Sequence, residues 1–301
     1  MFLIDINGVA GIMTRRQQEG VCGMGFTREE VLGRLRRQVA EKRAIVGAGA
    51  GTGISAKFIE HGGADMIIIY NSGRFRMAGH SSMCGLLALG DANAIVMEMG
   101  EREVLPVVHR TPVIAGVNGT DPTRQMSLLL QQVCAAGFSG VNNFPTVGLF
   151  DGRIRQELEA SGMGFEREVE MIGTAHDLGL FTIVYVFTPD EAKAMAAVGA
   201  DAVIAHMGLT VGGSIGMSAE GAFSLDDACE RVQTIGDAAL RENPDAILLC
   251  HGGPIATPED AAYVISRTNA VGFVGASSME RLPVETALTD TTAAFKNIRI
   301  A

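Results

Sequence analysis

Eight short apolar runs set the strongest limit on how this 301-residue chain can fold. They are rich in β-branched residues and are separated by helical or mixed segments. Runs of this kind, without polar alternation, are typical of parallel strands that are buried on both faces. The eight runs are Ala44–Gly49, Met66–Tyr70, Pro112–Val117, Ser139–Phe144, Phe181–Phe187, Ala202–Met207, Ala246–Cys250 and Val271–Gly275.

Helix start signals stand between these runs. A capping box begins at Thr27, Ser224 is a further N-cap, and proline follows Thr188 and Thr257 at the first helical position. Asp121-Pro122 predicts another helix start. Eight alternating units predict an α/β fold, a (β/α)8 TIM barrel with an extra N-terminal helix at its bottom. A doubly wound sheet is the alternative, but the glycine string 47–53 only partly matches its dinucleotide-binding fingerprint.

The chain divides unevenly. We expect residues 1–25 to form a flexible N-terminal leader and residues 26–301 to form a single TIM-barrel domain. The leader lacks the charged-then-apolar order of a signal peptide. Met13 and Met24 offer alternative start positions.

The composition of the chain limits the classes of partner that it can bind. A net charge of -10 argues against nucleic acid. Five scattered cysteines without a CxxC pair indicate reduced thiols and a cytoplasmic location, and no apolar run is long enough to span a membrane. An acidic barrel rich in alanine, glycine and methionine predicts a homo-oligomer.

The segment Leu248–Pro283 predicts an anion site. Its two strands each end in a small-residue loop, as in the phosphate site that follows the last two strands of many TIM barrels. Glycines allow close backbone approach, and N–H groups at a helix start favour an anion. We therefore expect a small anionic metabolite to be held by Gly252, Gly253, Gly275, Ala276, Ser277 and Ser278.

The remaining strand ends carry mostly neutral polar groups. They include Asn71, Arg74, Asn118, Asn143, Tyr185, His206 and His251. Arg74 suits bidentate capture of a carboxylate or phosphate, or is a surface arginine paired with an acid. His206 is a candidate acid–base group or a buried histidine satisfied by backbone, and His251 is a candidate anion donor.

Carboxylates are scarce at these strand ends, so the sequence does not decide whether the chain binds a metal. Asp91, Glu98 and Asp121 are the only plausible magnesium ligands, and they form no clear cluster. Asp91 is better interpreted as a helix N-cap. Glu98 lies within an apolar face and is a candidate base. Glu280 and Arg281 are interpreted as a structural pair at a helix start.

Several segments carry a family resemblance. They are IVGAGAGTGISAK, IIIYNSGRFRMAG, GDANAIVMEM, AGVNGTDP, GVNNFPTVGLFDG, VEMIGTAHDLGLFT, VIAHMGLTVGGSIG and CHGGPIATPEDA. Together they resemble the phosphoenolpyruvate hydrolase-like TIM-barrel family over residues 27–301. That family is related to the phosphonopyruvate hydrolase and phosphoenolpyruvate mutase barrels, and it is also described as a TIM-barrel signal-transduction domain.

The resemblance implies a hydrolase or lyase acting on a small phosphorylated or phosphono 2-oxo acid. Arg74, Asn71 and His251 would then bind substrate, Asn118 and Asn143 would stabilise an enolate, and His206 or Glu98 would move protons. The mutase group holds Mg²⁺ through strand-end carboxylates, whereas this sequence has asparagines at the comparable ends. The alternative is a barrel that senses a ligand, or binds a nucleotide, without turnover.

Overall fold

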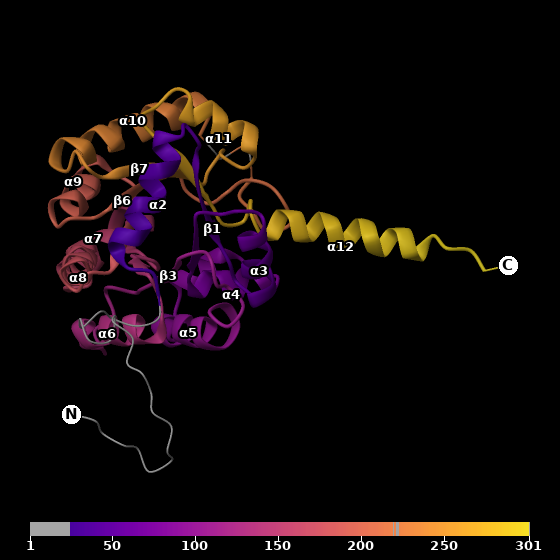
Figure 1. Cartoon of the computed structure of the whole chain (residues 1–301), viewed down its shortest axis with the longest axis horizontal. Coiled ribbons are helices and arrows are strands. Elements are labelled where there is room, and N and C mark those ends of the chain that lie inside the picture. Colours follow the sequence, from indigo (N-terminus) through magenta and orange to yellow (C-terminus); the bar gives the residue numbers. More distant parts are fainter. Residues whose placement is uncertain (1–24, 219, 221–222, 301) are drawn as a thin grey trace, which may run out of the picture.

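A closed barrel of eight parallel strands forms the centre of the molecule (Figure 1). The computed structural model describes residues 25–218, 220 and 223–300. Each strand pairs with the next along the chain, and β1 closes the ring by pairing with β8. The predicted leader lies outside the described residues except for Gly25.

The strands confirm the predicted apolar runs. Each observed strand falls within two residues of its run at either end, and nearly all strand residues are buried. Burial on both faces explains why the runs lack polar alternation. The strands are β1 (Ile45–Gly49), β2 (Met66–Ile69), β3 (Val113–Gly116), β4 (Gly140–Asn142), β5 (Phe181–Val186), β6 (Ala202–His206), β7 (Ile247–His251) and β8 (Gly272–Gly275).

Helices follow every strand, and α2 precedes the first. No helix in the described part of the chain is both long and apolar enough to cross a bilayer. The helices are α2 (Arg28–Ala40), α3 (Gly53–His61), α4 (Asn71–Met77), α5 (Ala92–Met99), α6 (Met126–Ala136), α7 (Gly152–Ala160), α8 (Phe165–Asp177), α9 (Pro189–Ala197), α10 (Leu225–Glu242), α11 (Pro258–Ile265) and α12 (Arg281–Lys296), with short turns η1 (Ser82–Leu86), η2 (Gly100–Val104) and η3 (Val147–Leu149).

The predicted helix starts hold with one exception. Thr27, Ser224 and Thr257 form complete capping boxes, and Asp91 caps α5. Asp121 does not start a helix, because its carboxylate binds the backbone and hydroxyl of Thr123 in a turn. The helix after β3 begins only at Met126.

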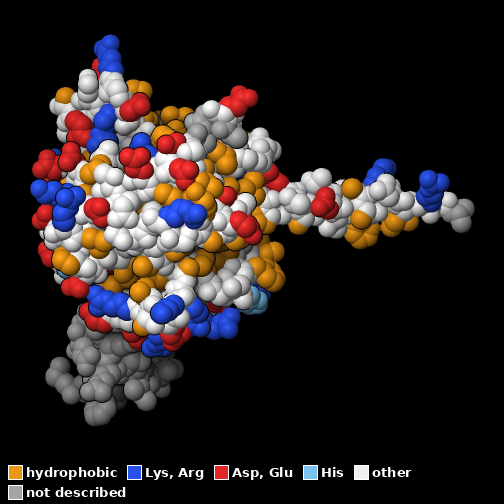
Figure 2. Space-filling model, turned by 90° about the horizontal axis from the view of Figure 1, so that it is seen from above, with side chains coloured by type: hydrophobic (Ala, Val, Ile, Leu, Met, Phe, Trp, Pro, Cys, Tyr) orange, Lys and Arg blue, Asp and Glu red, His pale blue; other side chains and the backbone are white. Residues whose placement is uncertain are grey.

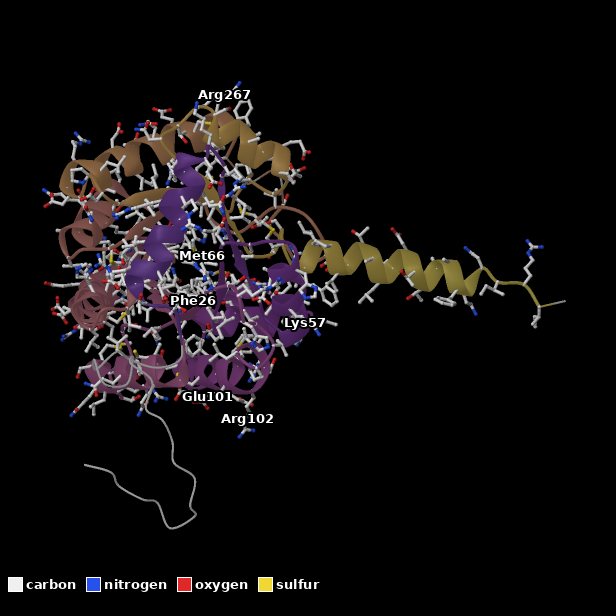
Figure 3. All side chains as sticks on the ribbon, viewed as in Figure 1. Phe26, Lys57, Met66, Glu101, Arg102 and Arg267 are labelled. Carbon is white, nitrogen blue, oxygen red and sulfur yellow. The ribbon has the colours of Figure 1, made fainter. Side chains whose placement is uncertain are left out.

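Helix α2 lies across the amino-terminal end of the barrel, as the sequence predicted (Figure 1). Arg28 on α2 donates to both carboxylate oxygens of buried Asp201, just before β6. Phe26 N–H donates to the hydroxyl of Ser139, just before β4. The labelled Phe26 and Met66 lie toward the middle of the molecule in Figure 3, whereas Lys57 lies at its edge.

Among the described helices, α12 is the one that leaves the barrel. It follows β8 and extends away from the other helices (Figure 1). It makes no extended packing contact with another described helix or strand. Its root, the residues Glu280 and Arg281, is buried.

The Arg28–Asp201 pair should fix α2 to the barrel. Arg28→Met is expected to lower the free energy of unfolding by about 1.5–3 kcal/mol, because a buried carboxylate loses charged hydrogen bonds. Arg36→Met, on the exposed face of the same helix, is the matched control and should change little. Urea unfolding of both variants measures the difference, and equal stabilities would refute the tether.

Candidate functional site

A cavity opens at the carboxyl ends of the strands, opposite α2. It contains about 440 Å³ of empty space, which includes its opening to solvent. Its walls are aromatic and aliphatic, with a few polar groups that point inward. The lining residues are Tyr70, Ser72, Arg76, Ser82, Met83, Leu86, Phe144, Leu149, Tyr185, His206, Gly208, Leu209, Thr210, His251, Ala276 and Ser277.

A buried ion pair forms one side of this cavity. Nε of Arg76 on α4 donates to Oε2 of Glu280 over 3.1 Å, and its Nη2 donates to the same oxygen over 2.5 Å. Both side chains are almost fully buried, at 1% and 0% exposure. The pair therefore adds hydrogen-bond donors to the wall but almost no net charge.

Glu280 also connects the loops at this end. Its Oε1 accepts the N–H of Gly51, which follows β1, over 2.7 Å. A Cβ at Gly51 would lie 2.1 Å from the carbonyl oxygen of Gly73, so only glycine allows β1 and α4 to approach this closely. The sequence interpretation of Glu280 and Arg281 as partners was wrong, because Arg281 binds Glu285 and the carbonyl of Gly212 instead.

Two histidines lie together in the cavity wall, with ring centroids 4.4 Å apart. Nδ1 of His206 accepts the N–H of Gly208, so its Nε2 carries the proton. Nδ1 of His251 lies 2.5 Å from the carbonyl oxygen of Val274, so Nδ1 is the protonated atom and Nε2 has a free lone pair. The two rings thus offer one donor and one acceptor.

Both imidazoles are neutral at physiological pH. Burial lowers the pKa of His206 well below its usual range, and the neighbouring His251 lowers it further. Burial also lowers the pKa of His251 to about 4, although the carbonyl of Val274 opposes this shift. Neutral imidazoles can exchange protons with a ligand without first losing one to water.

Tyr185 presents a hydroxyl that has no partner. It lies on β5 with 1% of its surface exposed, and no described group meets hydrogen-bond geometry with its OH, although the Tyr70 hydroxyl lies near enough to raise its pKa. Its ring packs against both histidines, at centroid distances of 4.9 Å and 5.2 Å. Burial raises the pKa of Tyr185 well above its usual range, so the phenol stays a hydrogen-bond donor.

Backbone donors complete the site after β8. Within the described residues, the N–H groups of Ala276, Ser277 and Ser278 donate to no backbone carbonyl. Ala276 and Ser277 line the cavity, and the buried Ser278 Oγ also has no partner. Successive free N–H groups form a concave site that favours an anion. This half of the predicted cradle therefore has the donors that an anion needs.

The glycines after β7 serve a different purpose. Gly253 N–H donates to the carbonyl of Gly208 over 2.9 Å, so it is not free for a ligand. A Cβ at Gly252 would lie 2.2 Å from the same carbonyl oxygen. Gly252 and Gly253 therefore let the loop after β7 pack against the loop after β6. Gly275 is buried within β8 and does not line the cavity.

Arg74 and Glu98 lie outside the cavity. Arg74 donates to Glu98 over 2.9 Å and to Glu103 over 2.6 Å. All three side chains are at least 32% exposed. The arginine that faces the cavity is Arg76, two positions later on the same helix. Arg74 is thus the surface arginine paired with an acid that the sequence left open.

The three asparagines bind neighbouring groups of the protein rather than face the cavity. Asn71 donates to the carbonyl of Gly85 and accepts the N–H of Ser72. Asn118 accepts from Thr120, and Asn143 joins β4 to the backbone of Tyr185 through both its amide groups. None of the three lines the cavity.

Glu168 on α8 supports the loop after β4 from behind. The carboxylate accepts the N–H of Val147 over 2.8 Å and the amide of Asn143 over 2.7 Å. This loop carries Phe144 and Leu149 into the cavity wall. Full burial raises the pKa of Glu168 to about 8, despite these hydrogen bonds.

The donor set does not fit a magnesium ion. No carboxylate lines the cavity, whose nearest acid is already bound to Arg76, and Mg²⁺ usually takes one or two carboxylates. Asp91 and Asp121 both pair with Arg124, and Glu98 pairs with Arg74. No cluster of three His, Cys, Asp or Glu side chains suitable for a metal exists among the described residues.

Sequence reasoning missed Arg76, Tyr70 and Ser72. Ser72 and Arg76 lie on α4 (Asn71–Met77). Helical periodicity would have placed Ser72 and Arg76 on one face and Arg74 on another. Tyr185 stood among the strand-end groups without a role, because burial of its hydroxyl depends on the closed barrel.

Comparison with known families gives this geometry a context. The model of the family described as phosphoenolpyruvate hydrolase-like matches residues 30–298. The chain belongs to this family. The resemblance of the sequence motifs to this family is therefore confirmed over nearly all of the barrel.

One relative is a tomato protein. The ToMV susceptible protein tm-1(GCR26) of Solanum lycopersicum is 61% identical over 269 residues, which make up 89% of this chain and 35% of that protein. The chain spans about a third of the length of this relative and of the ToMV resistance protein Tm-1(GCR237) from the same organism. What the whole relatives do therefore does not transfer directly to this barrel.

Two solved structures share the fold. The 2,3-dimethylmalate lyase, a PEP mutase/isocitrate lyase superfamily member, has a TM-score of 0.57 and 15% identity, covering 91% of this chain and 89% of its own. Phosphonopyruvate hydrolase, solved with oxalate and Mg²⁺, has a TM-score of 0.56 and 18% identity, covering 88% and 87%. At this level of identity the likeness concerns the fold.

The Arg76–Glu280 pair gives a first prediction for the site. Glu280→Ala should lower the free energy of unfolding by about 3–5 kcal/mol, because it leaves a buried guanidinium without its counter-charge. The double variant Arg76→Met/Glu280→Gln should lose clearly less. Glu170→Ala, which breaks an exposed pair with Arg167, is the control. A double variant less stable than Glu280→Ala would contradict the argument.

Glu168 predicts a pH dependence. Its folded pKa of about 8 lies above the ordinary value of 4.5, so the native state binds the extra proton between these values. The contribution of Glu168 to the free energy of unfolding should therefore be largest below pH 4.5 and should fall as pH rises to about 8. The slope is at most about 1.4 kcal/mol per pH unit. Glu168→Gln should flatten it in urea unfolding across this range; an unchanged slope would exclude Glu168 as its source.

Proposed function

We propose that this barrel binds and cleaves a small phosphorylated or phosphono 2-oxo acid, with release of the phospho group to water. The observation that carries the proposal is the set of unpaired donors around one cavity. These are the buried Tyr185 hydroxyl and the N–H groups of the lining residues Ala276 and Ser277, which donate to no described backbone carbonyl. Buried polar groups rarely lack partners unless a ligand or water supplies them.

The donors divide into two parts of the proposed substrate. The N–H groups after β8, with the Ser277 hydroxyl beside them, suit the phospho or phosphono oxygens. Tyr185 OH and His206 Nε2–H suit an oxo or enol oxygen, on which negative charge grows during cleavage. Arg76 adds further N–H donors to the cavity wall, although Glu280 balances its charge.

The proposal assigns proton transfer to the two histidines. As water attacks phosphorus, the lone pair on His251 Nε2 can accept the proton that the water loses. Cleavage of phosphonopyruvate leaves the enolate of pyruvate, and return of that proton to the enolate carbon gives pyruvate and phosphate. The atoms then balance with water as the only co-reactant. The low pKa of His251 keeps its Nε2 unprotonated before the attack and makes the imidazolium that forms a strong proton donor to the enolate carbon.

Magnesium has no place in these steps. The phosphonopyruvate hydrolase structure contains Mg²⁺ with oxalate, but the cavity of this chain has no carboxylate to hold the ion. The proposal therefore assigns charge stabilisation to peptide, phenol and imidazole donors. A cytoplasmic location and a homo-oligomeric state are further parts of this proposal.

A ligand sensor without turnover is the second candidate. It is favoured by the absence of a carboxylate base from the cavity lining and by the much greater length of the tomato relatives, which would allow this barrel to report to other parts of a protein. Binding without product separates the two candidates.

The test is isothermal titration with phosphonopyruvate, phosphoenolpyruvate and oxalate, each with and without Mg²⁺, followed by assay of phosphate release. Tyr185→Phe should weaken binding at least tenfold, about 1.4 kcal/mol. The same variant should unfold no more easily than wild type, because the hydroxyl it removes has no partner.

Tyr263→Phe is the matched control, because Tyr263 lies on α11 and its hydroxyl binds Asp226 outside the cavity. It should leave binding unchanged. No binding of any of the three compounds removes the substrate class, and binding without phosphate release favours the sensor.

A further inference from the structure

A mainly apolar groove lies beside the cavity at the carboxyl ends of the strands. Its lining comes from the loops after β2, β3 and β4 and from α7, and it contains about 1380 Å³ of empty space, which includes its opening to solvent. Leu87 and Ile154 line it, although they are exposed to 58% and 59%. Figure 2 shows one face of the barrel on which charged side chains lie among the hydrophobic ones. Apolar side chains gathered in a groove at this end of the barrel indicate a binding site.

The groove and the cavity share their walls. Leu86, in the loop after β2, lines both spaces. In the loop after β4, Phe144 and Leu149 line the cavity, whereas Pro145 and Phe150 line the groove. The two spaces therefore lie on either side of the same two loops, and Leu86 stands where they meet.

Hydrogen bonds hold these two loops in place. The Ser72 hydroxyl on α4 donates to the carbonyl of Ser82 over 2.7 Å, and the Asn71 amide donates to the carbonyl of Gly85 over 2.9 Å. A Cβ at Gly85 would lie 2.0 Å from Oγ of Ser72, so the loop after β2 lies directly on α4. Glu168 holds the loop after β4. The groove is therefore formed in advance, as ligand sites usually are.

The groove offers almost no free charge. Asp91 and Asp121 are the only ionisable residues in its described lining, and both of their carboxylates pair with Arg124. Asn118, which does not line the cavity, adds a neutral amide to the groove. An anionic group would find no counter-charge in this lining, whereas an apolar group would find aliphatic and aromatic side chains. The hydrogen-bond donors for an acid are in the cavity.

We infer that the ligand of this barrel carries an alkyl or aryl group, which passes Leu86 and lies in the groove while the acidic end occupies the cavity. The inference rests on the proposed function, because it adds a substituent to the same 2-oxo acid. The substituent would replace a hydrogen on the carbon that bears phosphorus, so the cleavage steps stay the same.

The apolar surface favours this occupant over others. A small polar acid alone would leave Leu87 and Ile154 in water, whereas an apolar substituent would remove part of their surface from water. A protein partner fits less well, because one side of a standard protein interface contributes about 20–30 residues, more than line this groove.

The experiment is isothermal titration of the full chain with phosphonopyruvate and with derivatives that carry a methyl, butyl or heptyl group on the carbon that bears phosphorus. Affinity should rise by up to about fourfold for each methylene that enters the groove. Leu87→Ser/Ile154→Ser should lower the ratio of the heptyl to the parent affinity by roughly tenfold. Leu128→Ser changes a leucine that is 50% exposed on α6, outside both spaces, and should keep the wild-type ratio.

A parallel series separates this inference from the proposed function. It consists of 2-oxobutanoate, 2-oxohexanoate and 2-oxodecanoate, which lack a phospho group. If phosphonopyruvate binds but longer chains add no affinity, or add as much in the groove variant as in wild type, the inference fails and the proposed function stands. If only the long 2-oxo acids bind, and bind less well to the groove variant, the apolar site stands and the phospho substrate fails. If no compound binds, both fail.

The mass of each variant tests the competing occupant. Sedimentation velocity should give the groove variant the same mass as wild type and the Leu128→Ser control. A lower mass for the groove variant alone would assign the groove to a contact between copies of the chain and would overturn the inference.

Discussion

The ion pair between Arg76 and Glu280 is the contact on which the carboxyl end of the barrel depends. It joins α4, the loop after β1 and the root of α12 in one set of hydrogen bonds. Burying two charges costs more free energy than most pairs return, and apolar replacements are often as stable. Such a pair therefore contributes mainly by fixing where its neighbours lie. It also leaves the cavity almost uncharged, so recognition of the proposed anion would rest on dipoles.

The fold could be predicted because its signals are local. Strands buried on both faces give continuous apolar runs, and Thr27, Ser224 and Thr257 cap helices through side chains only three residues away. Asp121 misled because an Asx-type turn and a helix N-cap use the same short carboxylate. The direction of α12 could not be predicted at all, since a helix with one apolar stripe has the same sequence pattern whichever surface it covers.

The site was harder to predict because it depends on which side of each element faces inward. Arg74 and Arg76 differ only by their phase on a short helix, and Glu280 and Arg281 are adjacent, so their side chains diverge. Asn71 and Asn143 bind backbone because a closed barrel leaves many peptide groups at the strand ends to satisfy. What distinguishes a ligand group is then a polar atom left without a partner, as at Tyr185, and only the packed structure reveals it.

The opposite tautomers of His206 and His251 have a consequence for any ligand between them. One imidazole offers a proton and its neighbour offers a lone pair, so the best-matched guest presents an acceptor and a hydrogen side by side. A singly protonated oxyanion has that pattern, and a fully ionised one does not. Uptake of a proton from solvent would then accompany binding whenever the free ligand is fully ionised. The heat of binding would vary with the ionisation enthalpy of the buffer, which makes the hidden arrangement of two hydrogens visible in solution.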